Sequence, residues 1–525
     1  MAEWWRGAVV YQIYPRSFRD TNGDGVGDLA GIRQGLDYIA SIGVDAIWLS
    51  PFFTSPMKDF GYDVSDYRAV DPMFGTLADF DALLAEAHAR GLKVIIDQVW
   101  SHSSDKHAWF AESSSSRDNP RADWYVWADP REDGTPPNNW LASFGGPAWT
   151  WSAKRRQYYL HNFLPEQPDL NFWNPDVQDA ILDIAKFWLD RGVDGFRLDV
   201  VNYYVHDRAL TDNPPAHRNR VPRMATDMQR HVKDRSQPET LLFINRLRAL
   251  MDSYADRMTV GEVGDDPPLP RQQEYTEPPD RLHTAYSFYL LNERHGTPAL
   301  FRSALESWAA ARGWPSWSLS NHDVPRFPTR MGGDNPALVR ALLAALVAMR
   351  GTIFLYQGDE LGLPDAHVPF DRLRDPYAIN AYAGGAGRDG ARTPMPWTDA
   401  APMGGFTSAP DAWLPMDPAH LPLSIVAQEN DPASMLAFTR QLLALRRATP
   451  ALQAGSALPL TSPDTVLAFQ RVLESEHIGC FFELGGVASR IDDIGSGEPL
   501  LLVGGAAIRD GGLDLPPHGS AILRL

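Results

Sequence analysis

The stretch Gly195-Phe196-Arg197-Leu198-Asp199 begins a short apolar run, residues 195–201, that carries a charged pair. Five other runs share its form, because each is short, apolar and rich in β-forming residues and each ends in polar or charged residues. They are residues 8–14, 46–49, 93–99, 259–263 and 316–320. Two further runs, residues 286–291 and 352–357, bring the predicted strands to eight.

Helical periodicity separates most of these runs. In residues 77–90 the apolar side chains recur on one face, Thr76 and Asp79 form a capping pattern, and Gly91 follows the end. The same pattern recurs in residues 177–191, 241–254 and 337–349. Alternating strands and helices over roughly 350 residues are typical of parallel β/α architecture. We therefore predict an α/β fold, a (β/α)8 TIM barrel, with a doubly wound sheet as the alternative.

Two segments interrupt this alternation and a third follows it. Residues 102–174, after the third strand, are rich in Ser, Pro, Asn, Trp and Gly and too long for a plain connection, which predicts an inserted domain. Residues 207–237, after the fourth strand, form a polar excursion with prolines and arginines. After about residue 450 we expect no helices, only short strands at 466–472, 477–484, 499–503 and 520–525. The predicted domains are a barrel of residues 1–101 and 175–450, the inserted domain 102–174, and a C-terminal all-β sandwich domain, residues 451–525.

Composition restricts the partners and the compartment. The formal net charge of −18 opposes binding to phosphate backbones, so nucleic acid is not an expected partner. The sequence contains no run of about 20 apolar residues, so we predict no membrane span. The first residues lack the pattern of a secretory signal, and Cys480 is the only cysteine. We expect a cytoplasmic protein without an intrachain disulfide.

Three acids at strand ends predict the functional site, because β/α barrels carry their active sites there. Arg197 and Asp199 lie two residues apart and so on the same side of the strand, where the guanidinium should lower the carboxyl pKa. Glu262, between glycines, should be partly desolvated, which raises its pKa toward that of a general acid. Asp323 follows the seventh strand within Asn321-His322-Asp323. Structural ion pairs and a polar turn are the alternatives.

Converging carboxylates without a phosphate-binding loop favour glycosidic-bond chemistry, in which one attacks the anomeric carbon and another protonates the departing oxygen. The same set also suits a metal site, with His102 and His322 as ligands. Catalytic zinc sites usually show closely spaced histidine pairs, and the sequence contains neither H-x-H nor H-E-x-x-H. The glycosidase interpretation is therefore favoured.

Four segments resemble the signature regions of glycoside hydrolase family 13, the α-amylase family, and occur in the family's order. They are residues 97–102 (DQVWSH), 195–199 (GFRLD), 261–263 (GEV) and 321–323 (NHD). Residues 167–171 (QPDLN) and 387–397 (GRDGARTPMPW) resemble segments of the α-glucosidase and oligo-1,6-glucosidase branch, and residues 11–18 (YQIYPRSF) match as well. The resemblance covers essentially the whole chain. Ser101 stands where the family usually has Asn.

The resemblance implies a role for each matching residue. Asp199 would be the nucleophile, Glu262 the acid/base, and Asp323 would stabilise the transition state. The implied substrate-binding residues are Asp63, Tyr62, His102, Phe144, Phe163, Arg197, His322 and Arg388. For Phe144 and Phe163, a place in the core of the inserted domain is the alternative.

The implied activity is that of a retaining, exo-acting α-glucosidase. It would release α-glucose from the non-reducing end of maltose-like disaccharides and short oligosaccharides and transfer glucose to alcohol acceptors. Residues 207–237 resemble the long loop of glucosidases that prefer disaccharides, and Val200 occupies a position that influences linkage preference in this branch. The alternative is a family 13 transferase or isomerase acting on sucrose or another α-glucoside. We expect a small-molecule α-glucoside as partner, and a monomer or homodimer.

Residues 20–28 (DTNGDGVGD) have the alternating oxygen donors and the sixth-position glycine of a calcium loop. Position twelve is Gly31 instead of Glu, and no helix pair flanks the loop, so a metal-free turn is the alternative. The branch that the chain resembles carries a structural Ca²⁺ or Mg²⁺ here. The implied ligands are Asp20, Asn22, Asp24, the Val26 carbonyl and Asp28. Such an ion would brace the loop and take no part in catalysis.

Overall fold

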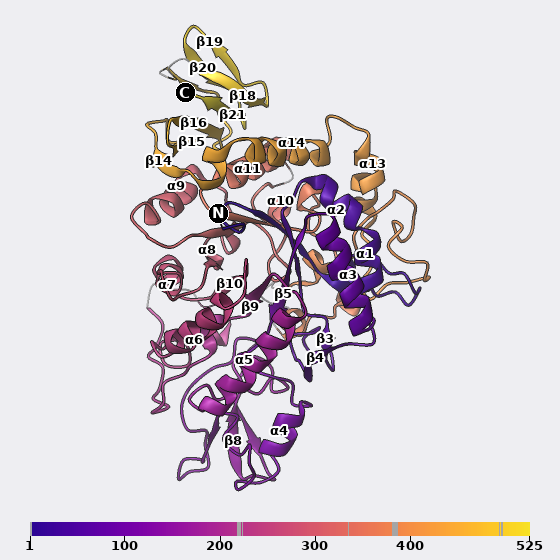
Figure 1. The fold of residues 1–525 in the computed structure, drawn as a ribbon, viewed down its shortest axis with the longest axis vertical. Helices are drawn as coiled ribbons and strands as arrows, with labels where there is room; N and C mark the ends of the chain where they lie inside the picture. Colours follow the sequence, from indigo (N-terminus) through magenta and orange to yellow (C-terminus); the bar gives the residue numbers. More distant parts are fainter. Residues whose placement is uncertain are drawn as a thin grey trace.

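A barrel of eight parallel strands forms the centre of the computed structural model, which describes residues 3–217, 222, 224–333, 335–380, 387–492, 494 and 497–525 (Figure 1). In chain order the strands are β1 (Val9–Ile13), β2 (Ala46–Leu49), β5 (Lys93–Gln98), β9 (Gly195–Leu198), β10 (Met258–Val263), β11 (Thr284–Ser287), β12 (Ser316–Ser318) and β13 (Thr352–Tyr356). They pair in the order β11-β10-β9-β5-β2-β1-β13-β12, and a parallel bridge between Ala285 and Pro315 joins the two ends. The predicted barrel is confirmed.

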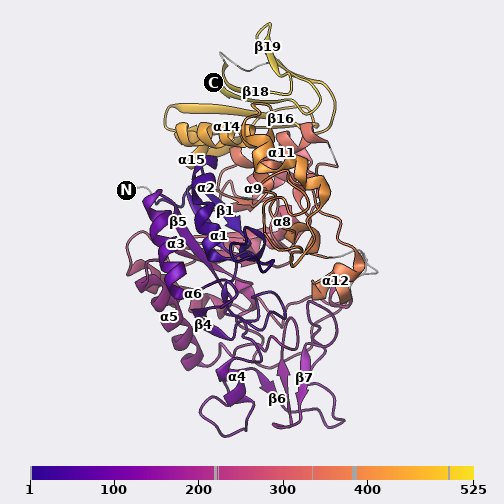
Figure 2. The ribbon, with the colours of Figure 1, turned by 90° about the vertical axis from the view of Figure 1, so that its right-hand side faces the viewer.

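Helices cover the outside of the barrel (Figure 2). The described α-helices outside the inserted segment, which include short helices of the connections, are α1 (Leu29–Gln34), α2 (Leu36–Ile42), α3 (Leu77–Ala89), α5 (Pro175–Asp190), α6 (Thr240–Asp252), α7 (Pro268–Tyr275), α8 (Phe288–Leu291), α9 (Pro298–Ser307), α10 (Phe327–Arg330), α11 (Pro336–Ala348), α12 (Pro376–Asn380), α13 (Ile425–Glu429), α14 (Met435–Ala448) and α15 (Pro450–Ala454). The capping box expected at Thr76 and Asp79 is present at the start of α3. α15 ends at Ala454, so the helices continue slightly beyond residue 450.

Two of the predicted barrel strands extend furthest beyond the strands in the structure. Strand β9 ends at Leu198, and Val200 beyond it has left-handed backbone angles of φ 35° and ψ 50°. Only the first two residues of the run 286–291 belong to β11, because Ser287 precedes the short helix α8. A short apolar run can form a buried strand or a buried helical turn, and its periodicity does not separate the two.

Two small β structures lie beside the carboxyl ends of the barrel strands. Within residues 102–174, the strands β6 (Trp127–Ala128), β8 (Gln157–Leu160) and β7 (Trp149–Ser152) form an antiparallel sheet accompanied by α4 (Ala108–Ser113). A core that includes Trp140, Trp149 and Leu160 holds this segment together. Strands β3 (Phe53–Thr54) and β4 (Asp66–Val70) form a hairpin that the sequence analysis did not predict. Its loop reaches the candidate site.

The C-terminal residues form two packed sheets, as expected for an all-β domain. One contains β14 (Ser456–Pro459), β15 (Val466–Leu473), β16 (Glu476–Glu483), β21 (Ser520–Arg524) and β18 (Glu498–Val503). The other contains β17 (Ser489–Ile491), β20 (Gly512–Leu515) and β19 (Ala507–Arg509). Side chains of both sheets, such as Phe481 and Leu513, share one apolar cluster. Among the described helices, none combines the length and apolar character needed to cross a membrane.

Candidate active site

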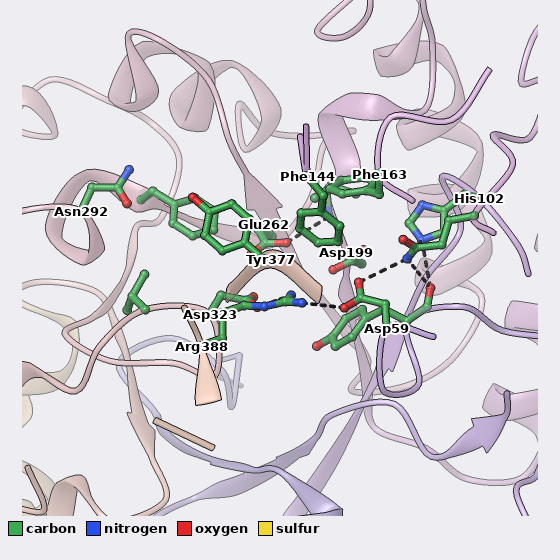
Figure 3. A pocket seen from close by; sticks show the side chains of 15 residues that line it. Asp59, His102, Phe144, Phe163, Asp199, Glu262, Asn292, Asp323, Tyr377 and Arg388 are labelled. Carbon is green, nitrogen blue, oxygen red and sulfur yellow. Dashed lines mark hydrogen bonds and ion pairs between the residues drawn. The ribbon is translucent and has the colours of Figure 1, made fainter. Parts of the chain in front are cut away.

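A cavity of about 220 Å³ lies where the barrel strands end and the inserted segment begins (Figure 3). Asp199 follows β9, Glu262 lies in β10, and Asp323 comes shortly after β12, so three different strands bring these acids to one place. The lining residues are Asp59, Tyr62, His102, Phe144, Phe163, Gln167, Asp199, Val200, Glu262, Phe288, Asn292, Asp323, Val324, Tyr377 and Arg388. The predicted convergence of the three acids is therefore present in the structure.

One buried guanidinium connects the acids of the cavity floor. Arg197 Nη1 lies 2.6 Å from Asp199 Oδ1 and 2.9 Å from Asp97 Oδ1, and Nη2 lies 2.7 Å from Glu262 Oε2. Strand register explains the contact between Arg197 and Asp97, because Asp97 of β5 is paired with Arg197 of β9. The pairing of β10 with β11 places Tyr286 beside Glu262, and its hydroxyl donates to Glu262 Oε1 over 3.3 Å.

Burial sets the protonation of these acids. It raises the pKa of Asp199 to about 7 and that of Glu262 to about 8, and the attraction of Arg197 offsets these rises only in part. The expected rise for Glu262 is confirmed. The expected fall for Asp199 is wrong, because desolvation outweighs the effect of the adjacent guanidinium. With the lower pKa of the two, Asp199 ionises first while Glu262 keeps its proton. The cavity can thus offer one carboxylate and one carboxylic acid to a bond held between them.

Asp323 has the opposite electrostatic environment. Burial opposes its ionisation, yet the adjacent His322 and the charges of Arg388 and Arg392 outweigh that effect and hold its pKa below the usual range. Asp323 Oδ1 lies 2.9 Å from Arg392 Nη2 and 3.3 Å from Arg388 Nη1. A permanently ionised carboxylate can accept hydrogen bonds from sugar hydroxyls and stabilise developing positive charge.

The two predicted histidines lie in different positions relative to the cavity. His102 lines it, 3.1 Å from Gln167 Nε2 and 2.9 Å from the Tyr62 carbonyl. His322 is fully buried behind Tyr62, whose hydroxyl lies 2.6 Å from its Nε2, and Gln12 Nε2 lies 2.7 Å from its other ring nitrogen. Like Arg197, His322 is absent from the cavity lining, so these two can orient lining groups without forming the wall.

The aspartate of the β3–β4 loop that reaches the cavity is Asp59, which corrects the prediction of Asp63. Asp59 lines the cavity, with Oδ1 2.6 Å from Arg388 Nη2. Asp63 is fully buried outside the lining, where Oδ1 accepts the Ser55 hydroxyl and the Asp59 amide and Oδ2 accepts the Lys58 amide. Its carboxylate folds the loop back on itself and thereby presents Asp59.

Aromatic rings form the wall on the side of the inserted segment. Phe144 and Phe163 both line the cavity, with ring centroids 5.7 Å apart, and Phe144 also packs against Tyr377 at 5.7 Å. The Arg388 guanidinium lies 5.0 Å from the Phe144 centroid. Phe144 and Phe163 therefore face the cavity instead of filling only the core of the inserted segment. Tyr377 and Asp375, which lies 2.7 Å from Arg388 Nη2, were missed, because they lie in a connection without a sequence pattern.

The backbone after β9 connects the two central acids. The amide of Val200 donates to Glu262 Oε2 over 3.2 Å. A β-branched residue in the left-handed region costs roughly 1–3 kcal/mol and persists only where its surroundings fix it. Asn202 supplies such a restraint, since Nδ2 donates to the Gly264 carbonyl over 2.9 Å and Oδ1 accepts the Gly264 amide over 3.2 Å.

The loop predicted to bind a cation is built from side chains that accept backbone amides. Asp20 accepts the amides of Asn22, Gly23 and Gly25, and Asp28 accepts that of Gly31. Within the described part of the chain, no three His, Cys, Asp or Glu side chains are grouped so that they could hold a metal ion. The oxygen donors are of the type that a hard cation prefers, and their contacts with backbone amides fold the loop through a series of turns.

Comparisons with known proteins find relatives along nearly the whole chain. A family model described as "Alpha amylase, catalytic domain" matches residues 12–455. A "Probable alpha-glucosidase" of Rhizobium meliloti is 51% identical over 499 residues, covering 93% of this chain and 90% of that protein. An oligo-1,6-glucosidase of Heyndrickxia coagulans is 38% identical over 522 residues, 91% of each chain.

Solved structures match the whole of this chain. The crystal structure of an α-glucosyl transfer enzyme has a TM-score of 0.96 and 51% identity, with 100% of both chains covered. The trehalulose synthase of Pseudomonas mesoacidophila MX-45 has a TM-score of 0.90 and 33% identity, again with 100% of both chains covered.

Proposed function

We propose, from the premise that this chain belongs to the α-amylase family of glycoside hydrolases, that it is a retaining, exo-acting α-glucosidase. Its family branch is that of the α-glucosidases and oligo-1,6-glucosidases. The proposed substrates are maltose-like disaccharides and short oligosaccharides, and the proposed products are α-glucose and glucosides of alcohol acceptors. The observation that carries this proposal is the pairing of Asp199 and Glu262 through Arg197 on the floor of one cavity.

Two displacements at the anomeric carbon make up the reaction. Asp199 attacks that carbon while Glu262 gives its proton to the glycosidic oxygen, so the leaving group departs as an alcohol and a glucosyl ester remains. The Glu262 carboxylate then removes a proton from water or from an acceptor alcohol, which attacks the same carbon and releases Asp199. Two inversions retain the α configuration. Arg197 remains between the two carboxyl groups throughout.

The remaining polar groups are proposed to hold one terminal glucose. Arg388 lies between Asp59 and Asp323 along one side of the cavity, where all three can meet hydroxyl groups. His102 and Gln167 lie on another part of the lining, and Tyr62 presents its ring there. A site that surrounds a single sugar ring favours removal of end residues over cleavage inside a chain.

A transferase or isomerase acting on sucrose or another α-glucoside is the second candidate. It is favoured by the solved structures of an α-glucosyl transfer enzyme and a trehalulose synthase, which match the whole chain. Both candidates share the first displacement and differ in what receives the glucosyl group.

We further propose a structural Ca²⁺ or Mg²⁺ in the Asp20–Asp28 loop, a cytoplasmic location, and a monomer or homodimer. These proposals rest on the sequence patterns given above.

Proton NMR of the protein mixed with maltose tests the proposal. We expect α-glucose to form first, in excess over its equilibrium with β-glucose, and new glucosidic signals to report transfer. Asp199→Asn should abolish both, whereas Asp190→Asn, a matched change on the exposed surface of α5, should leave them unchanged. β-Glucose as the first product, or activity that persists in Asp199→Asn, would refute the mechanism. Reaction with sucrose but not maltose would favour the second candidate.

A further inference from the structure

A second cavity of about 500 Å³ adjoins the catalytic one, and we call it the outer pocket. It shares Phe288 and Asn292 with the catalytic cavity. Its other lining residues are Ser143, Tyr203, Ala216, His217, Thr226, Asp227, Gln229, Arg230, His231, Val232, Arg235, Gly264, Asp265, Asp266 and Pro267. If a glucose fills the catalytic cavity, as the proposed function requires, the leaving group or acceptor must lie in the outer pocket.

The segment that supplies most of this lining is basic within an acidic protein. The whole chain has a formal net charge of −18, but residues 207–237 contain six arginines and one lysine against four aspartates. Two arginines of this segment, Arg230 and Arg235, line the outer pocket.

Arg235 is the cation best placed to meet a ligand. Its side chain is half-buried and lines the outer pocket, yet its guanidinium makes no hydrogen bond or ion pair with any described residue. It lies over the Tyr203 ring at 4.7 Å, and Tyr203 packs at 5.4 Å against Phe163 of the catalytic cavity. Five N–H donors are therefore left for a ligand beside the reaction site.

The acids of the outer pocket are already engaged. Asp265 lies 2.7 Å from Arg271 Nε, and Asp227 and Asp266 have partners too. Arg230 is exposed at the same cavity and, like Arg235, pairs with no acid among the described residues. The unpaired charge that faces the cavity is consequently positive.

The backbone that carries Arg235 is fixed to the catalytic loops. The neighbouring Ser236 donates its amide to the Asn202 carbonyl over 2.6 Å, and its hydroxyl accepts from Asn202 Nδ2 over 3.0 Å. The same Asn202 side chain holds Gly264, two residues after Glu262. Arg235 is therefore held at a set place relative to the acids, which lowers the entropy cost of binding through its side chain.

We propose that the outer pocket binds an anionic group, a carboxylate or a phosphate ester, on the leaving group or acceptor, with Arg235 as its principal ligand. The inference rests on the proposed function and refines it, since it names the class of α-glucoside that the site prefers. A guanidinium binds such anions through paired, charge-assisted hydrogen bonds that a neutral amide cannot replace.

Three aryl α-glucosides test this preference, with a carboxylate, a phosphate ester or the neutral carboxamide at the para position. For the wild type we expect kcat/KM to be about tenfold higher for the anions than for the carboxamide, and this ratio to fall as salt rises. Arg235→Gln should reduce the ratio to about one while changing the carboxamide rate less than twofold. Arg235→Lys should restore most of the ratio.

Arg208→Gln is the matched control, because Arg208 belongs to the same segment but lies over Trp173 in a different cavity. It should keep the selectivity of the wild type. A wild-type ratio near one, or an unchanged ratio in Arg235→Gln, would overturn the inference while the proposed function stands. A preference for only one anion would identify which group the pocket accepts. Failure to cleave any of the three glucosides would overturn the proposed function, and the inference with it.

Discussion

Arg197 contacts three carboxyl groups in a site that water scarcely reaches. A single cation cannot compensate three ionised acids at low dielectric, so the cluster retains at least one proton near neutral pH. Its pKa values belong to the coupled set, and the order of ionisation decides what the set can do. Burial raises the pKa of Asp199 to about 7 and that of Glu262 to about 8. An ionised Asp199 beside a protonated Glu262 is therefore most populated in a narrow pH range.

This order of ionisation predicts a bell-shaped dependence of kcat/KM on pH. Activity requires Asp199 ionised and Glu262 protonated, so kcat/KM should fall below a pH of about 7 and again above about 8. Initial rates at constant ionic strength measure both limbs. Glu262→Gln should lose most of the activity and the alkaline limb with it. A wild-type alkaline limb that persists unchanged in Glu262→Gln would assign that proton to another group.

Asp59 and Asp63 predict opposite phenotypes for the same substitution. Asp59→Asn removes a charge from the cavity and from Arg388, so kcat/KM should fall about 30-fold or more with little change in Tm. Asp63→Asn replaces one of two acceptor oxygens with an NH2 group that faces a backbone amide donor inside the loop, so it should lower the free energy of unfolding by about 1–3 kcal/mol. Thermal unfolding and steady-state rates of both variants separate the two effects. A larger loss of kcat/KM in Asp63→Asn than in Asp59→Asn would contradict this assignment.

Some residues of the candidate site could be predicted from the sequence, and others could not. Asp199, Glu262 and Asp323 were predictable, because each acid stands at the end of an apolar strand and parallel strands bring such ends together. The position of Asp59 depends on how the β3–β4 loop folds, which side-chain contacts within the loop decide. The contact between Asp97 and Arg197 depends on strand register, which no local pattern reports.

The connection between β1 and α1 is the element for which we propose a bound ion. Its aspartates are predicted to hold a cation, and in the structure they accept backbone amides that fold the loop. The loop also joins a distant part of the chain, since the Asp20 amide donates to the Phe406 carbonyl over 2.9 Å and the Trp413 amide donates to that of Gly25 over 3.0 Å. An ion bound here would stabilise both segments at once.

We predict that Ca²⁺ raises Tm and that a chelator lowers it, without changing kcat. An ion that binds only the folded state at 100 times its Kd contributes about 2.7 kcal/mol. Differential scanning calorimetry with added Ca²⁺, Mg²⁺ or EDTA measures the effect. In Asp24→Asn the dependence on the ion should weaken, while Asp81→Asn, an exposed aspartate of α3, serves as the control. Identical Tm values with Ca²⁺ and with EDTA would show that the turns hold the loop without a metal.

The predictions were most accurate for elements that have sequence signals at both ends. They were less accurate for elements marked only by an apolar run. α3 has a capping residue, an apolar face and a terminal glycine, and its predicted start matches the structure. The run 286–291 has only its apolar character, and most of it forms α8 instead of a strand. In such runs the local sequence is compatible with either a strand or a helix, so tertiary packing determines which one forms.

The whole molecule has a core that continues from the barrel into the C-terminal sheets. α11 is buried on nearly all sides, because it packs against α14 and against β16 of the C-terminal domain. Residues of the barrel, of α11 and of β16 belong to one apolar cluster. A helix that is apolar all round requires neighbours on every side, so the C-terminal domain contributes to the stability of the barrel. The titration of buried groups in this shared structure should therefore affect its overall stability.

Buried acids and histidines together predict a maximum of stability near pH 6.5. Burial raises the pKa values of Asp169, Asp199 and Asp359 to about 7 and that of Glu262 to about 8. These folded-state values exceed those of unfolded carboxyls, so the folded chain keeps protons that the unfolded chain has lost. The resulting stability is fully present below the unfolded carboxyl pKa of about 4 and is lost progressively as pH rises to the folded values of about 7 and 8.

Burial also lowers the pKa values of several histidines to about 4, and these are His102, His107, His161, His206 and His420. Below pH 6.5 the unfolded chain protonates its histidines while the folded chain does not, so stability should fall again. Urea unfolding from pH 5 to 8.5 measures both slopes. Asp359→Asn, outside the cavity, removes one of the raised carboxyls and should reduce the loss of stability between pH 5 and 7 by up to about 1.4 kcal/mol per pH unit. If stability instead rose steadily from pH 6.5 to 8, these acids would be ionised in the folded state, and the narrow pH range of activity would lose its basis as well.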